Sequence, residues 1–68
     1  MAFVVIELQK LADGNVANIV TQKDTENEAY SHYHSILAAA AVSELPCHSA
    51  VILGEDGFPV AHQCYKHE

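Results

Sequence analysis

Residues 24–45 are the only stretch of the sequence with the length and periodicity of a helix, and they limit the fold more than any other feature. Apolar side chains recur there every three or four positions, which is the spacing of one helix face. They are Ala29, Tyr33, Ile36, Leu37 and Ala40. Thr25 and Glu28 have the spacing of a capping box, and Pro46 disfavours helix in the residue before it. We therefore expect a single helix that begins near Thr25 and closes before Pro46.

Segments on both sides of this helix alternate between apolar and polar residues, as half-buried strands do. The expected strands are residues 2–10, 16–22, 47–53 and 58–66. Asp13-Gly14 is a strong hairpin signal, and Glu55-Asp56-Gly57 is a second turn. The order β-β-α-β-β predicts an α+β fold, with a four-stranded, mainly antiparallel sheet and one helix across one face. All 68 residues are expected to form one domain.

The first hairpin decides which residues face the helix. A two-residue loop at Asp13-Gly14 would pair Leu8 with Ile19 and Ile6 with Thr21. The face that receives the helix is then expected to contain Ile6, Leu8, Ala17 and Ile19. The opposite face is expected to contain Phe3, Val5, Leu11, Val16 and Val20. This second face is too apolar to be stable in contact with water.

The uncovered sheet face and the small size of the chain predict an oligomer. A 68-residue domain buries only about 60% of the surface of its unfolded chain, so it usually gains stability from disulfides, a metal or association. Two cysteines are too few for a disulfide scaffold. We expect a homodimer or higher oligomer, because a second copy is the commonest cover for such a face. The alanine run at 38–41 permits a close contact with the chain's own sheet or, alternatively, with another subunit.

The net charge of −6, with only three basic residues, argues against nucleic-acid binding, which depends on clustered cations. It does not exclude a small anionic ligand, since backbone amides and neutral donors also hold phosphate. No signal peptide is visible, and no apolar run approaches the roughly 20 residues that span a bilayer. We therefore expect a cytoplasmic protein with reduced thiols, without a nucleic-acid or membrane partner.

Aromatic and imidazole side chains are the expected ligand contacts. Aromatic rings stack on bases, and histidine and tyrosine donate hydrogen bonds to phosphate or ribose. The predicted ligand-binding residues are Tyr30, Tyr33, His34, Tyr65, Lys66 and His67. For the last three, a frayed chain end is an equally good interpretation. Glu28 and His32 are four positions apart, which is more typical of a weak surface pair than of a site.

Cys47, His48, His62 and Cys64 form the one cluster of metal-ligand types, so a small metal-binding protein is one alternative. Neighbours on a strand point to opposite faces, so we do not expect Cys47 and His48 to bind one ion. Burial of both cysteines as small hydrophobic residues explains them more simply. Neither a metal site nor a disulfide between Cys47 and Cys64 is predicted.

The sequence predicts no catalytic residues, no cofactor and no enzymatic activity. It contains no G-x-S-x-G, H-E-x-x-H or C-x-x-C motif and no glycine-rich phosphate loop. Its serines lack a neighbouring pattern of base and orienting acid. A chain of this length also leaves little room to enclose an active site, except between subunits.

Four segments resemble a group of very small, uncharacterised proteins that are carried by phages and prophages of gut bacteria. They are FVVIEL (residues 3–8), NEA (27–29), AAAAVS (38–43) and CYKH (64–67). The resemblance covers nearly the whole chain and is one of overall pattern. Small oligomeric phage proteins of this size include sponges, which bind the cyclic dinucleotides or ADP-ribose derivatives that bacterial defence systems make. The resemblance therefore implies a nucleotide-sequestering, anti-defence role in the host cytoplasm, and it implies nothing about which residues bind.

The leading hypothesis is a non-enzymatic homo-oligomer that binds a nucleotide-type small molecule in pockets between its subunits. The main alternative is a protein-interaction module that docks a host protein through its exposed sheet face. Both follow from a sheet with two apolar faces and only one helix to cover them.

Overall fold

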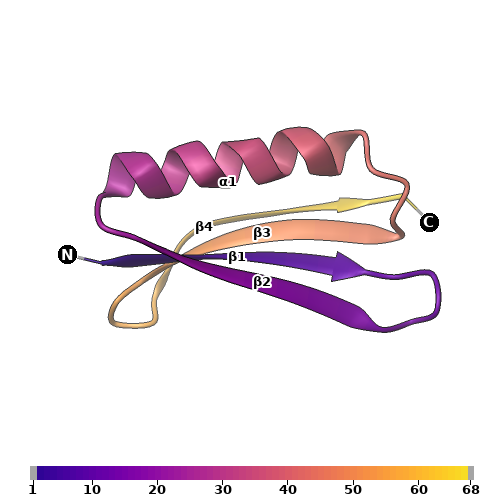
Figure 1. Cartoon of the computed structure of the whole chain (residues 1–68), viewed down its shortest axis with the longest axis horizontal. Helices are drawn as coiled ribbons and strands as arrows, with labels where there is room; N and C mark the ends of the chain where they lie inside the picture. The colour runs from indigo at the N-terminus through magenta and orange to yellow at the C-terminus, as the bar shows by residue number, and fades with distance from the viewer. Residues whose placement is uncertain (1, 68) are drawn as a thin grey trace.

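The structure, a computed structural model that describes residues 2–67, places one helix against a sheet of four strands within those residues (Figure 1). The elements are β1 (Phe3–Lys10), β2 (Val16–Lys23), α1 (Glu26–Ala41), β3 (Cys47–Gly54) and β4 (Pro59–Lys66). All neighbouring strands are antiparallel, in the order β2-β1-β3-β4. The predicted β-β-α-β-β fold is confirmed. No helix within residues 2–67 is long and apolar enough to cross a membrane.

Helix α1 begins at a cap that differs in one bond from the predicted capping box. Thr25 is extended (φ −127°, ψ 156°), and its Oγ1 accepts a hydrogen bond from the Glu28 amide at 3.2 Å. The Thr25 hydroxyl donates to Glu28 Oε1 at 3.0 Å, so the carboxylate pairs with the hydroxyl. These bonds satisfy one of the free amides of the first turn and fix the start of the helix.

The end of α1 does not depend on Pro46, contrary to the expectation. The helix ends at Ala41, and the Ser43 amide donates to the carbonyl of Ala40 at 3.2 Å. The Leu45 amide then donates to Ser43 Oγ at 3.1 Å, which turns the chain toward β3. The Ser43 side chain thus offers the backbone a hydrogen bond that competes with continuation of the helix. The helix therefore ends several residues before Pro46.

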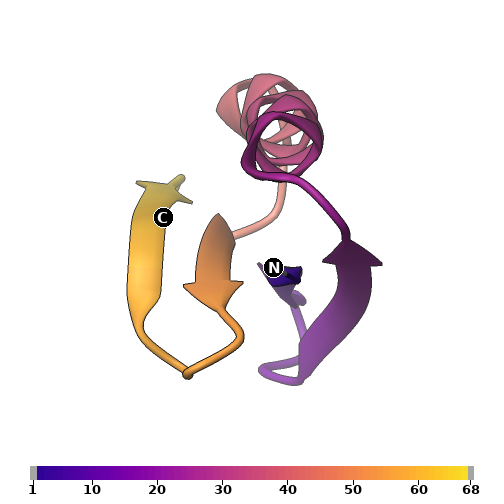
Figure 2. The same cartoon turned by 90° about the vertical axis from the view of Figure 1, so that its left-hand side faces the viewer.

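The core lies between α1 and the two central strands. Phe3 and Val5 of β1, with Ala50 and Ile52 of β3, pack against one stripe of the helix. That stripe contains the buried residues Ala29, Tyr33, Ile36 and Ala40, with Leu37 partly buried beside the core. The predicted apolar stripe is confirmed. Figure 2 shows α1 above the middle of the sheet, so both edge strands lie to the sides of the helix.

The β1–β2 turn has a three-residue loop, and the predicted register is therefore wrong by one residue. The Leu11 amide donates to the Asn15 carbonyl at 2.8 Å, and the Gly14 amide donates to the Leu11 carbonyl at 3.0 Å. Gly14 has φ +94°, a conformation that favours glycine and accommodates the extra residue. As a result Leu8 pairs with Asn18 rather than Ile19.

This shift changes which side chains of β1 face the helix, because a slip of one residue reverses the faces. Phe3 and Val5 pack under α1, and Ile6 and Leu8 point away from it, contrary to the prediction. Ala17 and Ile19 are register partners of Gln9 and Glu7, on the helix side as expected. Val16 and Val20 also lie on the predicted side, away from the helix.

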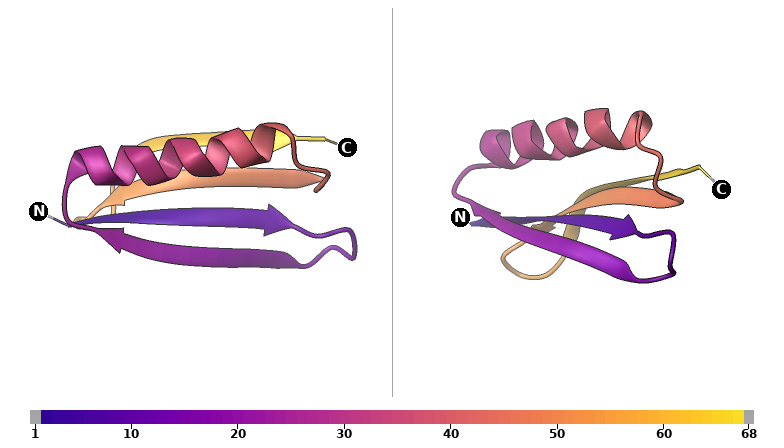
Figure 3. Two further views of the ribbon diagram at one scale, coloured as in Figure 1. Left: turned by 45° about the horizontal axis from the view of Figure 1, so that its top comes forward. Right: turned by 45° about the vertical axis from the view of Figure 1, so that its right-hand side comes forward.

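Figure 3 shows that α1 covers only one face of the sheet. We refer to the other surface as the open face. Its apolar residues are Val4, Ile6, Leu8, Val16, Val20, Val51 and Leu53. Val16 and Val20 are 58% and 61% exposed. Lys10 and Lys66 both flank Cys47 in the register, so the two cations of the open face lie at one end of it. None of the strand residues on this face is acidic.

Candidate functional site

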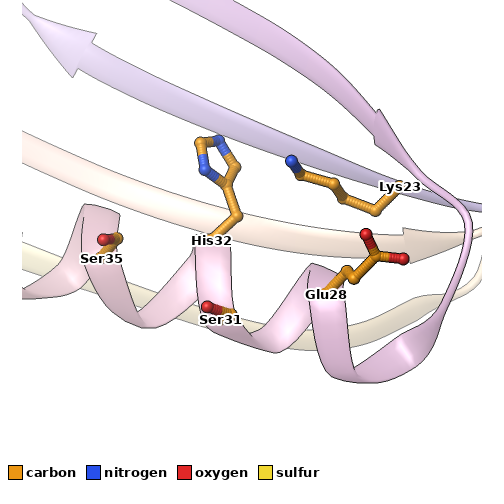
Figure 4. A pocket seen from close by; sticks show the side chains of 5 residues that line it. All are labelled: Lys23, Glu28, Ser31, His32 and Ser35. Atoms are coloured by element: carbon orange, nitrogen blue, oxygen red, sulfur yellow. The ribbon is translucent and has the colours of Figure 1, made fainter.

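A polar hollow of about 320 Å³ lies between α1 and the end of β2 (Figure 4). We refer to this space as the hollow. It is lined by Lys23, Glu28, Ser31, His32 and Ser35. Figure 4 shows the Lys23 and His32 side chains extending into the same region, with the Glu28 carboxylate close to Lys23. The hollow therefore combines a cation, an imidazole, two hydroxyls and a carboxylate.

Helical spacing brings four of these side chains together. Glu28, Ser31, His32 and Ser35 are at positions i, i+3, i+4 and i+7, which lie on one side of a helix. The apolar stripe, which packs on β1 and β3, lies on a different side of the helix. Lys23 is the last residue of β2 and pairs with Phe3, so it comes from the helix side of the sheet. The edge position of β2 leaves space beside the helix that no other strand fills.

A buried hydrogen-bond network lies beneath α1, on the two central strands. Glu7 Oε2 accepts a hydrogen bond from Gln9 Nε2 at 2.8 Å and lies 2.6 Å from His48 Nε2. The side chains of His48 and Glu7 are only 5% and 17% exposed. An ionised carboxylate only accepts hydrogen bonds, so His48 Nε2 carries the proton and donates to Glu7. His48 Nδ1 is buried and has no hydrogen-bond partner among residues 2–67.

The pKa of Glu7 lies below its ordinary value despite burial. Burial raises this pKa, but the hydrogen bonds from Gln9 and His48 and the charges of His48 and His32 outweigh it. The network has a structural role, because Glu7 satisfies an imidazole N–H that would otherwise be buried without a partner.

The predicted ligand-binding residues lie apart from the hollow: Tyr33 is buried in the apolar stripe of α1, and Tyr30 and His34 lie beside it on the same helix. The ring centroids of Tyr30 and Tyr33 are 6.0 Å apart, and those of Tyr33 and His34 are 5.4 Å apart. Burial, with the charges of Tyr30 and Tyr65, raises the pKa of Tyr33. The rings of Tyr65 and His67 stack at 6.5 Å. We refer to these five residues as the aromatic cluster.

His67, which directly follows β4, is held in place, in contrast to the frayed-end interpretation. His67 Nε2 donates to the carbonyl of Ala40 at 2.9 Å, and the His67 amide donates to the carbonyl of Pro46 at 3.0 Å. The His67 ring thus satisfies a carbonyl at the end of α1. Lys66, the sixth predicted residue, points to the open face because neighbours on a strand alternate. None of the six predicted residues lines the hollow.

The hollow was missed because its residues were interpreted one pair at a time. Glu28 and His32 were predicted to form a weak surface pair. A lysine that precedes the helix, followed by four polar residues on one helix side, is the signal that would have predicted it. This pattern predicts a hollow specifically only when the helix is known to lie over β1 and β3, with β2 at the edge.

The cysteines and histidines of β3 and β4 divide between the two faces. His48 is buried under α1, whereas Cys47 and Cys64 lie on the open face with their sulfurs 3.0 Å apart. Cys47 and His48 point to opposite faces of the sheet, as predicted, but the expected burial of both cysteines is wrong, because Cys64 is exposed and Cys47 is half-buried. Within residues 2–67, no three His, Cys, Asp or Glu side chains come together as a metal site.

Comparisons of this chain with protein-family models, with curated proteins and with solved structures found no match. The chemistry of the hollow therefore has to be inferred from its own residues. Neither Ser31 nor Ser35, the two hydroxyl groups of the hollow, is hydrogen bonded to His32 within residues 2–67.

Proposed function

We propose that this chain is a small, non-enzymatic binding protein that acts as a homodimer and holds a nucleotide-type molecule in the hollow. The observation that carries the proposal is the hollow itself, in which Lys23, His32 and two serines surround a space of about 320 Å³. That volume is at the lower end of the range for small-molecule sites. It suits a ligand with the dimensions of a phosphate-bearing fragment.

The donors and the acceptor of the hollow match two parts of a nucleotide. Lys23 brings three N–H donors and a positive charge, and the hydroxyls of Ser31 and Ser35 also donate to phosphate oxygens. Glu28 accepts hydrogen bonds, which suits a ribose hydroxyl or a base amino group. Such binding sequesters the ligand without changing it. In the cytoplasm of an infected bacterium this is a sponge, the role that the resemblance to phage proteins implies.

The open face supplies the surface for a second copy. Four strands about 4.8 Å apart and eight residues long, at about 3.3 Å per residue, give a projected area of about 500 Å² per subunit. Two such surfaces together reach about 1,000 Å², which is about the minimum area expected of a biological interface. A twofold interface uses the same patch on both subunits, and the open face is apolar enough to be that patch.

The charges at the two ends of the sheet favour one orientation of the dimer. Lys10 and Lys66 lie at one end of the open face, and Glu55 and Asp56 form the β3–β4 turn at the opposite end. A twofold axis perpendicular to the strands brings the lysines of one subunit toward the acidic turn of its partner. An axis parallel to the strands would instead bring lysines together, which is unfavourable.

The ligand proposal is tested by calorimetry and native mass spectrometry with inorganic phosphate, mononucleotides, cyclic dinucleotides and ADP-ribose. We expect retention of at least one nucleotide and at least a tenfold loss of affinity in Lys23→Ala, because a charge-assisted hydrogen bond contributes about 1.5–3 kcal/mol. Lys66→Ala is the matched control, since it removes the same charge from the open face. Binding that survives Lys23→Ala but is lost in Tyr30→Ala would assign the ligand to the aromatic cluster. A failure to retain any ligand of the panel would contradict the proposal.

The same open face supports a second function, the docking of a host protein. This function predicts a monomer in the absence of the host protein, whereas the homodimer predicts association of the pure chain. The mass of the pure chain in solution therefore separates the two.

A further inference from the structure

Two thiol groups meet on the open face, at the end that also carries the lysines. The sulfurs of Cys47 in β3 and Cys64 in β4 are 3.0 Å apart, close enough for a hydrogen bond between the thiols. In the register Cys47 pairs with Lys66 and Cys64 pairs with Ser49, so the two cysteines are diagonal neighbours across the ladder. Both residues lie in strands whose backbones are fixed by the sheet. Their proximity is therefore a property of the fold and not of a mobile loop.

We propose that Cys47 and Cys64 form a dithiol–disulfide pair that exchanges with small-molecule disulfides such as oxidised glutathione. This site is separate from the hollow and from the aromatic cluster, because it lies on the opposite face of the sheet. Its existence does not depend on the proposed function. Each cysteine takes a defined part in the exchange.

Cys64 is the attacking group, because its side chain is exposed to solvent, whereas that of Cys47 is half-buried and therefore less accessible. The Cys64 thiolate attacks one sulfur of glutathione disulfide, which breaks that S–S bond, forms a mixed disulfide and releases one glutathione thiolate. The Cys47 thiolate then attacks the Cys64 sulfur and releases the second glutathione. The protein loses two protons and two electrons, and one glutathione disulfide becomes two thiols. The protons of the two cysteines pass through solvent to the two released thiolates.

The surroundings of the pair favour the second step over side reactions. Once Cys64 carries glutathione, the nearest thiol is Cys47 of the same chain, so exchange within the chain is faster than attack by a second molecule.

The hydrogen bond with Cys47, burial and the charge of Cys47 raise the pKa of the Cys64 thiol, and Lys66 offsets part of this rise. A raised pKa reduces the thiolate fraction at neutral pH. The exchange is therefore expected to accelerate as the pH rises.

The disulfide would connect the edge strand β4 to β3 at the end opposite their turn. The β3–β4 hairpin is closed by the turn at Glu55–Phe58, where the Gly54 amide donates to the Phe58 carbonyl at 2.9 Å. A second, covalent closure at Cys47 and Cys64 would hold both ends of the hairpin. Oxidation therefore has a structural consequence that hydrogen exchange of the β4 amides would detect.

The test equilibrates the reduced full chain with glutathione buffers of increasing oxidised fraction, followed by acid quench and intact mass measurement. Equilibrium values are used because association through the open face would slow access to the thiols without preventing exchange. We expect one main product, a single chain lighter by two hydrogens. In Cys47→Ser, glutathione is expected to stay attached to Cys64. A chain that stays reduced in every buffer, or one whose main product is a glutathione adduct or a disulfide-linked dimer, would overturn the proposal.

A matched control keeps two thiols on the same strands and on the same face. In the double variant Cys64→Ser/His62→Cys, the second thiol moves two residues along β4, away from the register partner of Cys47. This variant is expected to form glutathione adducts and no internal disulfide. An internal disulfide in the control as efficient as in the natural chain would show that proximity in the native sheet is not its cause, and would also overturn the proposal. Circular dichroism of both variants checks that the sheet is intact.

Discussion

The bond between Glu7 and His48 gives the sharpest prediction about stability. Glu7→Leu removes the acceptor of the 2.6 Å contact with His48, whose side chain is only 5% exposed. The imidazole N–H that is left has little contact with water, because the His48 side chain is almost fully buried. Gln9 also loses its bond to Glu7, but Gln9 is only partly buried and can be solvated instead. The main loss therefore comes from His48.

The expected size of the effect follows from the chemistry of a buried donor without a partner. Such a group costs about 1–3 kcal/mol, and a bond to an ionised carboxylate lies in the upper half of that range. We expect Glu7→Leu to lower the free energy of unfolding by about 2 kcal/mol. The double variant Glu7→Leu/His48→Leu should recover at least half of this loss, because it also removes the unpaired Nδ1 of His48.

Urea denaturation of the four proteins in the double-mutant cycle measures these differences, at one fixed chain concentration because association shifts apparent stability.

The pH dependence provides a second test. The pKa of Glu7 in the folded chain is below the reference value of 4.5, so the folded state holds the carboxylate ionised more firmly than the unfolded state. The stabilisation is therefore complete above that reference value and is lost as the pH falls through the folded pKa. Glu7→Gln should remove this part of the acid sensitivity.

Two outcomes would refute the reasoning about this network. A Glu7→Leu variant within 0.5 kcal/mol of the natural chain would lie in the range of neutral surface substitutions, and would show that His48 is solvated. A double variant that is destabilised by the sum of the two single changes would show that Glu7 and His48 are not energetically coupled.

Two further predictions concern the core and the start of the helix. Ile52 is fully buried, so Ile52→Ala should cost about 2–5 kcal/mol of unfolding free energy, whereas Val42→Ala at an 83% exposed site should stay within about 0.5 kcal/mol. Equal losses in a thermal or urea melt would contradict the position of the core. Thr25→Ala removes the acceptor of the Glu28 amide and should cost about 1 kcal/mol, while Thr25→Ser should retain most of it. A serine variant as unstable as the alanine variant would mean that the hydroxyl is not the cap.

Local patterns were sufficient to predict the elements of this fold but not the register of its first hairpin. The apolar spacing of α1 and the alternation of the strands are local properties, and both were interpreted correctly. The sequence Asp13-Gly14 suits a two-residue turn and also a three-residue loop with glycine in the left-handed region. The structure has the three-residue loop. Phe3 and Val5 therefore face the helix in place of Ile6 and Leu8, which the prediction had assigned to that face.

The strand order had a signal in the sequence that was not used. β1 and β3 contain runs that are apolar on both faces, as central strands are, whereas β2 and β4 include polar residues such as Asn18 and Gln63. The pairing of Glu7 with His48 depends on this order, since it joins residues 41 positions apart. The hollow likewise needs β2 at the edge and α1 over the centre. Spacing along the chain contains none of this information.

The central claim is that the open face needs a second copy of the chain, and the solution mass tests it most directly. Sedimentation equilibrium over a dilution series is expected to give twice the 7.4 kDa mass of the subunit, with dissociation on dilution. Val20→Glu places a charge on the open face at a 61% exposed position, and Ile19→Glu places the same charge on the helix side at a 54% exposed position of the same strand. We predict a monomer for Val20→Glu and a dimer for Ile19→Glu. A natural chain that is a folded monomer at every concentration, or two variants with the same mass, would contradict the claim.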